Sequence, residues 1–122
     1  MWIFTRLGFF SIVCANESET SSKLDQTQLM IRSRSRKQLE ALKARFTELA
    51  KYPIKTNTGT DYPCRLIVER GVFEKVMAVL TSEIDYGNFK NAAGAQPGAD
   101  EYHYALNEVW TVMRNFQNED VK

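Results

Sequence analysis

Residues 28–39, QLMIRSRSRKQL, decide the fold, because the periodicity of their side chains changes from that of a strand to that of a helix. In the first half, apolar and polar side chains alternate, which is typical of a strand with one buried face. Ile31 falls on one face, and Arg32 and Arg34 fall on the other. The second half opens at Ser35, a residue type that favours the N-cap position. The sequence therefore predicts a strand that is followed at once by a helix.

The predicted helix covers residues 35–51. Gln38 stands three residues after Ser35 and completes a capping-box pattern. Pro53 cannot continue a helix, so we expect the helix to end at about Lys51. The helix carries one apolar stripe at helical spacing, made of Leu39, Leu42, Phe46 and Leu49.

Further elements are expected on both sides of this segment. Apolar residues on either side of residues 6–8 predict a hairpin, and a run rich in β-branched residues predicts a strand close to the middle of the chain. Gly87 is a suitable left-handed cap for the second helix. The expected strands are 2–5, 9–14, 28–34, a short edge strand at 54–57, and 64–69; the other two helices are 71–85 and 100–116.

These elements predict an α+β fold. We expect one antiparallel sheet, formed by the N-terminal hairpin and two or three further strands and covered on one face by three helices. The arrangement has a ferredoxin-like character, from which the initial hairpin departs. A chain of 122 residues is expected to form a single domain over 1–122, with a flexible loop at 16–26, a linker at 91–99 and a frayed tail at 117–122.

Composition limits the possible functions. The chain has 16 basic and 15 acidic residues, so no overall field directs it to nucleic acid or to an anionic membrane. Cys14 and Cys64 form no CxxC pair, and His103 is the single histidine, so neither a metal site nor a cofactor is expected. We expect two free thiols in a reducing cytoplasm, although adjacent strands would permit a disulfide. Residues 1–15 superficially resemble a signal peptide, but Gly8 and the apolar residues before Arg6 favour the hairpin.

A run of basic residues crosses the predicted strand-to-helix boundary. Arg32, Arg34, Arg36 and Lys37 could together hold the phosphates of a nucleic acid. The alternative is a solvated sheet face on which the arginines pair with Glu69 or with residues of a neighbouring strand. No stacking aromatic residue accompanies the run in the sequence, so nucleic-acid binding is not the favoured interpretation.

Two tyrosine segments lie at the ends of regular elements. The first, residues 59–63, contains Asp61 and Tyr62, and we expect the tyrosine hydroxyl to hold this loop in place. The second follows the second helix, where Asn88 is expected to bond the free carbonyls at the helix end. If the segments meet in space, they form an amphipathic surface suited to protein recognition. The candidate binding residues of this surface are Asp61, Tyr62, Asp85, Tyr86, Asn88 and Lys90.

Several short motifs occur together in the chain: WIFTxxGFFS at residues 2–11, GTDYP at 59–63, and IDYxNFK at 84–90. With Tyr104 and Trp110, they resemble a family of small hypothetical proteins of bacteria and phages. The resemblance covers most of the chain except residues 16–26 and 91–99. It implies a stand-alone cytoplasmic domain and carries over no activity.

The favoured function is that of a small non-enzymatic binding or accessory protein, which recognises a protein partner near the tyrosine segments. A homodimer is possible, because the aromatic hairpin and an exposed sheet leave apolar area to cover. The alternative is nucleic-acid binding through the basic run. An enzyme acting through Asp61, Tyr62, Asp85 and His103 is the weakest interpretation, because no catalytic residues are evident in the sequence.

Overall fold

The computed structural model describes residues 1–56 and 59–120, with side chains to residue 117. The chain forms two compact units, residues 1–84 and 85–122, which are described separately. In the first unit, strands β1 (Trp2–Thr5), β2 (Gly8–Asn16), β3 (Leu24–Ser33), β4 (Lys55–Thr56) and β5 (Cys64–Glu69) form one sheet in the order β1-β2-β3-β5-β4. All four strand pairs are antiparallel. The predicted α+β class is thereby confirmed.

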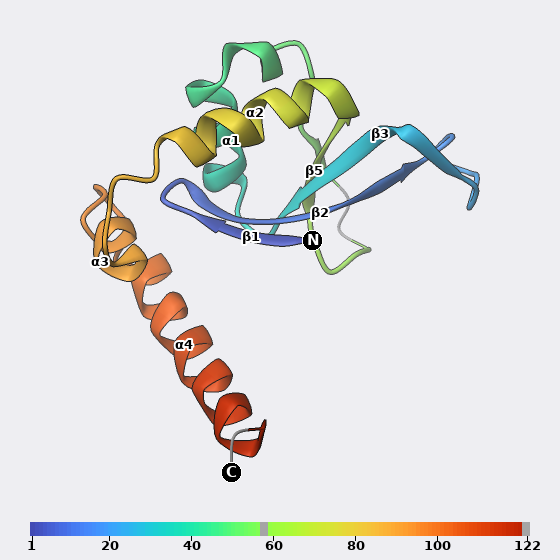
Figure 1. Cartoon of the computed structure of the whole chain (residues 1–122). Coiled ribbons are helices and arrows are strands. Elements are labelled where there is room, and N and C mark those ends of the chain that lie inside the picture. The colour runs from blue at the N-terminus through green and yellow to red at the C-terminus, as the bar shows by residue number, and fades with distance from the viewer. Residues whose placement is uncertain (57–58, 121–122) are drawn as a thin grey trace. The chain divides into compact units, whose positions relative to one another are not determined.

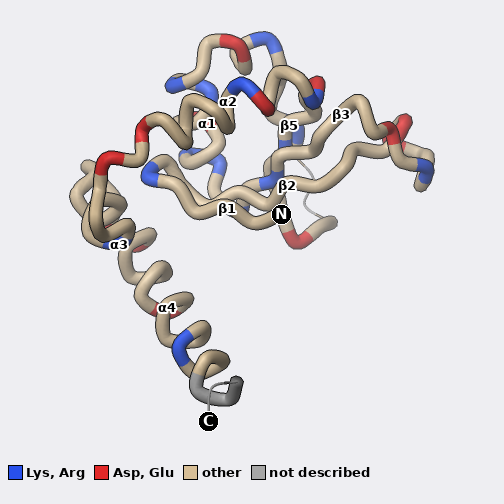
Figure 2. Tube along the Cα trace, viewed as in Figure 1, with Lys and Arg blue, Asp and Glu red and all other residues tan. Residues whose placement is uncertain are grey.

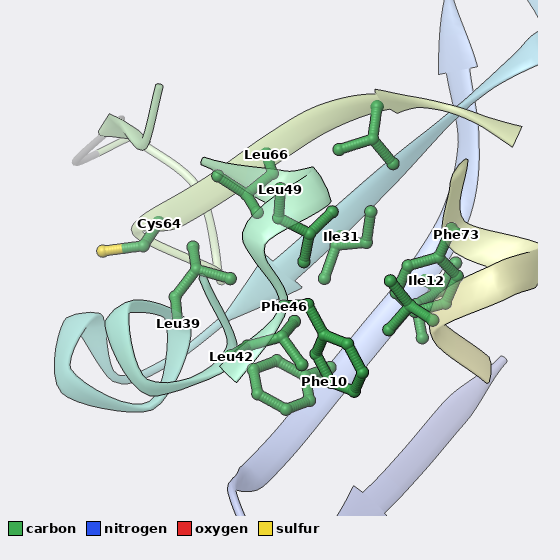
Figure 3. Packing of buried hydrophobic residues seen from close by; sticks show 12 residues of the cluster. Phe10, Ile12, Ile31, Leu39, Leu42, Phe46, Leu49, Cys64, Leu66 and Phe73 are labelled. Carbon is green, nitrogen blue, oxygen red and sulfur yellow. The ribbon is translucent and has the colours of Figure 1, made fainter. Parts of the chain in front are cut away.

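Two helices of the first unit cover one face of this sheet, as Figure 1 shows: α1 (Arg36–Arg45) and α2 (Arg70–Ser82). A short 3-10 helix, η1 (Thr47–Leu49), follows α1. Figure 3 shows the core between the helices and the sheet. Alternate residues of β2, β3 and β5 point into it, where they meet the apolar stripes of the helices; the fully buried side chains include Phe10, Ile31, Leu39, Leu42, Leu49, Leu66 and Val76.

The order of elements follows from local signals in the sequence. The hairpin turns at Arg6 and Leu7, where the Thr5 hydroxyl accepts hydrogen bonds from Leu7 N and Gly8 N, each at 3.1 Å. Three strands precede the first helix. The sheet therefore departs from the β-α-β-β-α-β order of a ferredoxin-like fold, as the predicted hairpin already indicated.

The first helix begins as predicted and ends earlier. The Ser35 side chain accepts a hydrogen bond from Gln38 N, so the N-cap is confirmed. The Gln38 side chain accepts a hydrogen bond from Phe9 N at 3.1 Å instead of completing the capping box. The prediction that the helix reaches Lys51 was wrong: Phe46 is extended, with φ −118° and ψ 102°, and separates α1 from the η1 turn. Leu49 is still buried, because the turn replaces the last helical turn.

The connections between the first strands also differ from the predicted loop at 16–26. β2 continues to Asn16 and β3 starts at Leu24. A register shift between Cys14 and Ala15 indicates a β-bulge. Both cysteines are free, because Cys14 and Cys64 lie on β2 and β5, which are separated by β3. Residue 57 of the predicted edge strand lies outside the described residues.

The second unit consists of α3 (Phe89–Gly94) and α4 (Asp100–Asp120), which pack against each other. The predicted linker over 91–99 differs in its first part, where α3 continues to Gly94. The Asn88 side chain accepts a hydrogen bond from Asn91 N at 3.0 Å, so Asn88 starts α3 and does not close α2. Gly87 lacks the predicted left-handed conformation, and α2 already ends at Ser82.

Candidate functional site

The face of the sheet opposite α1 and α2 is called the open face. Within the described part of the first unit, no helix packs on it. It combines aromatic, aliphatic and cationic side chains, which is an unusual composition for a surface in water. The strand residues of the open face are Trp2, Phe4, Phe9, Ser11, Val13, Gln28, Met30, Arg32, Lys55, Arg65, Ile67 and Glu69.

The strand register aligns five residues of the open face in one row. Trp2 pairs with Ser11, Ser11 with Arg32, Arg32 with Arg65, and Arg65 with Lys55. Neighbouring strands are about 4.8 Å apart, so the row extends for roughly 19 Å from β1 to β4. It carries three consecutive cations and has a tryptophan at its other end. We call these residues the cross-strand row.

Two arginines of the predicted basic run contact the first tyrosine segment. The guanidinium carbons of Arg32 and Arg34 lie 4.6 Å and 4.5 Å from the centre of the Tyr62 ring, within the range of cation–π interactions. Arg34 Nη1 also donates to Asp61 O at 2.9 Å. Tyr62 is only 6% exposed. The ring therefore holds the loop on the sheet. The tyrosine hydroxyl was predicted to do this, but no hydrogen bond of that hydroxyl is found among the described residues.

Arg65 fixes the other side of the same loop. Its Nη2 donates to Thr60 Oγ1 at 2.7 Å and lies 3.4 Å from Tyr62 O. The Thr60 hydroxyl in turn donates to Tyr62 O at 2.9 Å. The GTDYP segment is therefore positioned by arginines of two neighbouring strands, β3 and β5.

Three aromatic residues continue from Tyr62 to the edge of the sheet. The Phe9 ring lies 6.4 Å from the Tyr62 ring and stacks on Phe4 at 4.7 Å with an interplanar angle of 20°. Trp2 meets Phe9 edge-on at 5.5 Å. Trp2 is 67% exposed, so its indole face is available to another molecule. We call Trp2, Phe4 and Phe9 the aromatic edge.

The arginines of the open face lack acidic partners. Within the described residues, none of Arg32, Arg34 and Arg65 forms an ion pair with a carboxylate. Arg32 Nη2 donates to Ser11 Oγ at 2.7 Å, but the Nε atoms of Arg32 and Arg65 are buried without a partner. Like charges that face each other across a strand pair are destabilising. The arrangement therefore leaves an uncompensated positive charge, which an anion would neutralise. Figure 2 shows basic segments of β3 and β5 next to one another.

The basic run is divided by the fold. Arg32 and Arg34 reach the open face, whereas Arg36 lies on α1 and pairs with Glu40 at 2.9 Å. Lys37 is an exposed residue of the same helix. The strand register adds two cations that were not predicted as part of the site, Arg65 and Lys55. The alternation of β5 indicated that Arg65 lies on the face opposite to the core, but no local pattern indicated its strand partner.

Residues 85–90 of the second tyrosine segment belong to the second unit, and the first segment belongs to the first unit. In the second unit the Tyr86 and Phe89 rings lie 5.8 Å apart. Lys90 Nζ lies 4.8 Å from the centre of the Trp110 ring and 3.2 Å from Asn107 Oδ1. Lys90 therefore connects α3 to α4. Asp85 is exposed.

His103 has a packing role in the second unit. A Cβ atom placed on Gly94 would lie 2.8 Å from the imidazole ring, so α3 and α4 approach closely at this pair. Among the described residues, histidine, cysteine and acidic side chains form no group that could hold a metal ion. None of the helices in the described ranges combines the length and apolar composition needed to cross a membrane.

Comparisons of the chain with protein-family models, curated proteins and solved structures give no match. The case for a function therefore rests on the residues of the chain itself.

Proposed function

We propose that this protein binds single-stranded nucleic acid on the open face of its sheet. The observation that carries the proposal is the cross-strand row, in which Arg32 and Arg65 face each other without a carboxylate and Lys55 follows on the next strand. Three neighbouring cations can contact successive phosphates of a nucleic-acid backbone. The geometry favours a nucleic acid over the protein partner expected from the sequence.

The aromatic edge supplies the second element of such a site. Base stacking on exposed aromatic rings is how sheet surfaces bind unpaired bases, and each stacked base contributes about 1–3 kcal/mol. Trp2 lies at the end of the row and exposes its indole. A strand running along the row would place phosphates over the arginines and a base on Trp2. Paired bases cannot be stacked in this way, so the site discriminates against a duplex.

The burial of Tyr62 argues against the tyrosine segment as a protein-binding surface. Residues that dominate protein interfaces insert exposed side chains into a partner. The Tyr62 ring is covered by Arg32 and Arg34 and serves to position them. The exposed groups that remain around it are guanidinium groups and aromatic rings, which are the groups that bind nucleotides.

Fluorescence anisotropy with a labelled single-stranded oligonucleotide over a range of salt concentrations tests the proposal. Three phosphate contacts predict that log K falls against log salt with a slope of about −2. Lys55→Gln and Arg65→Gln should each reduce the size of that slope by about 0.7. Trp2→Ala should weaken binding roughly tenfold or more with the slope unchanged, because it removes a stacking surface and no charge.

Lys75→Gln is the matched control, since Lys75 is exposed on α2 and the substitution makes the same change in net charge. It should leave both affinity and slope unchanged. Affinity independent of salt, an equal loss with Lys75→Gln, or equal affinity for a duplex of the same length would contradict the proposal.

A second candidate function, self-association, rests on α4. Apolar residues recur along this helix at alternating spacings of four and three residues. This is the pattern of the contact stripe between two paired helices in a coiled coil. The first part of this stripe is buried at Leu106, whereas the rest is exposed. Its charged neighbours lie outside the stripe, so a second copy of the helix would meet no like charge. The stripe is Tyr102, Leu106, Val109, Met113 and Phe116.

Sedimentation equilibrium at high micromolar concentration tests this candidate. The unaltered protein should form dimers, and Met113→Lys should make it monomeric. Asn115→Lys adds the same charge two residues away, outside the stripe, and should leave the dimer intact. A monomeric unaltered protein, or the same loss of dimer with both variants, would remove this function.

A further inference from the structure

A cavity of about 600 Å³ lies on the open face, next to the cationic end of the cross-strand row. Its volume is within the range of pockets that hold small organic ligands, roughly 300–1,000 Å³. Residues of β3, β4 and β5 form one side, and the turn after β2 forms the other. The lining residues include Gln28, Met30, Lys55, Arg65 and Ile67, with Asn16 at the end of β2 and residues 17–20 of the turn.

The cavity is partly apolar. Met30 and Ile67 are paired across β3 and β5, and both are partly buried on the open face. A methionine side chain adapts its shape to flat rings and favours contact with them. The Gln28 and Asn16 side chains add amide groups that can donate to and accept from a polar ring. This combination fits a planar heterocycle with polar edges.

The cationic side of the cavity is shared with the row. Arg65 directs its Nη1 to within 3.8 Å of Met30 Sδ, so the guanidinium group lies beside the apolar part of the cavity. Lys55 pairs with Arg65 in the register, and its Nζ lies 3.4 Å from Glu19 Oε1. The Lys55–Glu19 pair is exposed, and such pairs contribute little to stability. A phosphate could therefore replace Glu19 as the partner of Lys55 at small cost.

We propose that this cavity binds one nucleotide with a terminal phosphate, its base over Met30 and Ile67 and its phosphate at Arg65 and Lys55. The inference rests on the proposed function, because Arg65 belongs to both sites. The nucleotide has two possible sources, a free nucleoside monophosphate or the 5′-phosphorylated end of a single strand. At the end of a strand, the cavity would fix the terminal nucleotide and the row would bind the nucleotides that follow.

The turn after β2 forms one rim of the cavity and reaches β4 through Glu19. Glu17 N donates to Lys23 O at 2.8 Å, and Ser18 Oγ lies 3.4 Å from Thr20 Oγ1, so the turn is closed by its own hydrogen bonds. Glu19 is the acidic residue of this rim that contacts Lys55. Removing its charge should strengthen phosphate binding, because Lys55 would lose its competing partner. This effect distinguishes the cavity from a diffuse cationic surface.

The test follows the methyl signals of Met30 and Ile67 by NMR during titration with adenosine 5′-monophosphate. Both signals should shift in a saturable way. Adenosine should bind more weakly for lack of a phosphate, and inorganic phosphate should leave the methyl signals unshifted for lack of a ring. Lys55→Gln should weaken binding of the monophosphate roughly fivefold, and Glu19→Gln should strengthen it by a few fold. Lys75→Gln is again the control and should change nothing.

Oligonucleotides with and without a 5′-phosphate separate the two sources and the two proposals. Tighter binding of the phosphorylated strand, with shifts at Met30 and Ile67, assigns the cavity to the end of a strand. Shifts with the free monophosphate and equal binding of both strands assign it to the free nucleotide. Salt-dependent strand binding without shifts from any nucleotide overturns the cavity inference and leaves the proposed function intact. Shifts with the monophosphate and no strand binding overturn the proposed function alone.

Discussion

Arg32 and Arg65 are directly paired across the antiparallel strands β3 and β5, and within the described residues neither meets a carboxylate. Like charges at directly opposed positions lower the stability of a sheet. The two side chains nevertheless occupy fixed places, because Arg32 bonds Ser11 and contacts the Tyr62 ring, and Arg65 bonds Thr60. Such local conflicts occur at functional sites, where a ligand supplies the missing charge.

The charge conflict predicts an unfavourable coupling between these two residues. In a double-mutant cycle with Arg32→Gln and Arg65→Gln, the coupling free energy of unfolding should be destabilising by about 0.2–1 kcal/mol at low salt. It should become smaller as salt rises, because the charges are partly exposed and are screened. Chemical denaturation at two salt concentrations measures it. A favourable coupling would mean that the guanidinium groups stabilise each other in the free protein, and the argument for an anionic ligand would fail.

The Tyr62 ring is predicted to stabilise the sheet without its hydroxyl. Tyr62→Phe should change the free energy of unfolding little, since the contacts with Arg32, Arg34 and Phe9 all involve the ring. Tyr62→Ala should cost about 3 kcal/mol, because a buried ring is lost and the loop is released from the sheet. Urea denaturation of both variants measures the difference. An equal cost for Phe and Ala would instead assign the role to the hydroxyl.

Local patterns were sufficient to predict several elements of the first unit. The hairpin, the strand over 64–69 and the Ser35 cap depend on neighbours within a few residues, and the structure confirms them. The early end of α1 at Arg45 could not be predicted, because no proline or glycine stands there. Phe46 is extended, and its ring and Leu49 are both buried in the core, where contacts with other elements outweigh local helix propensity.

Only part of the candidate site could be predicted from the sequence. Arg32 and Arg34 were recognised as a basic run, but they were taken together with Arg36 and Lys37, which the helix directs elsewhere. The partners Arg65 and Lys55 are far away in the chain and join the row only through strand register. Register depends on the pairing of whole strands and not on any local motif. The aromatic edge could not be associated with the basic run either, because its residues come from the N-terminal hairpin.

Asn88 is predicted to control the formation of α3. Asn88→Ala should destabilise this helix by about 1 kcal/mol, because Asn91 N loses its side-chain acceptor. Asn88→Asp should retain most of the stability, since aspartate is an equally good N-cap. Amide hydrogen exchange of residues 91–95 in the two variants measures the effect. Unchanged protection in Asn88→Ala would show that packing on α4 alone holds α3.

Asp25 gives a prediction that depends on pH. Hydrogen bonds from the Thr27 hydroxyl and the Thr27 backbone N–H lower the pKa of its carboxyl below the ordinary value. Because the pKa is lower in the folded state, the ionised Asp25 carboxylate stabilises the fold. Its contribution to the free energy of unfolding is present above the unfolded pKa and is lost as the pH falls through the folded pKa. An NMR titration of the Asp25 carboxyl carbon should show the lowered value, and Thr27→Val should raise it towards normal. The same pKa in both proteins would contradict the assigned cause.

Gly8 should tolerate no side chain, for two separable reasons. Its φ of +151° is a conformation that favours glycine, and a Cβ atom there would lie 2.5 Å from Gln38 Cδ. Gly8→Ala should therefore cost about 3 kcal/mol in unfolding free energy, as the sum of backbone strain and overpacking. Gln38→Ala alone should cost less, because it removes a single hydrogen-bond acceptor, that of Phe9 N on β2. In the Gln38→Ala background, Gly8→Ala should lose its close contacts with Gln38 Cδ and Oε1 but keep the one with the Cβ of residue 38, at 2.6 Å, together with the backbone component. The two substitutions should therefore show a partial favourable coupling. Thermal and urea unfolding of the four proteins measure this cycle. Strict additivity would mean that the far end of the Gln38 side chain moves aside freely, and that the backbone conformation and the contact with the Cβ of residue 38 require glycine at the start of β2.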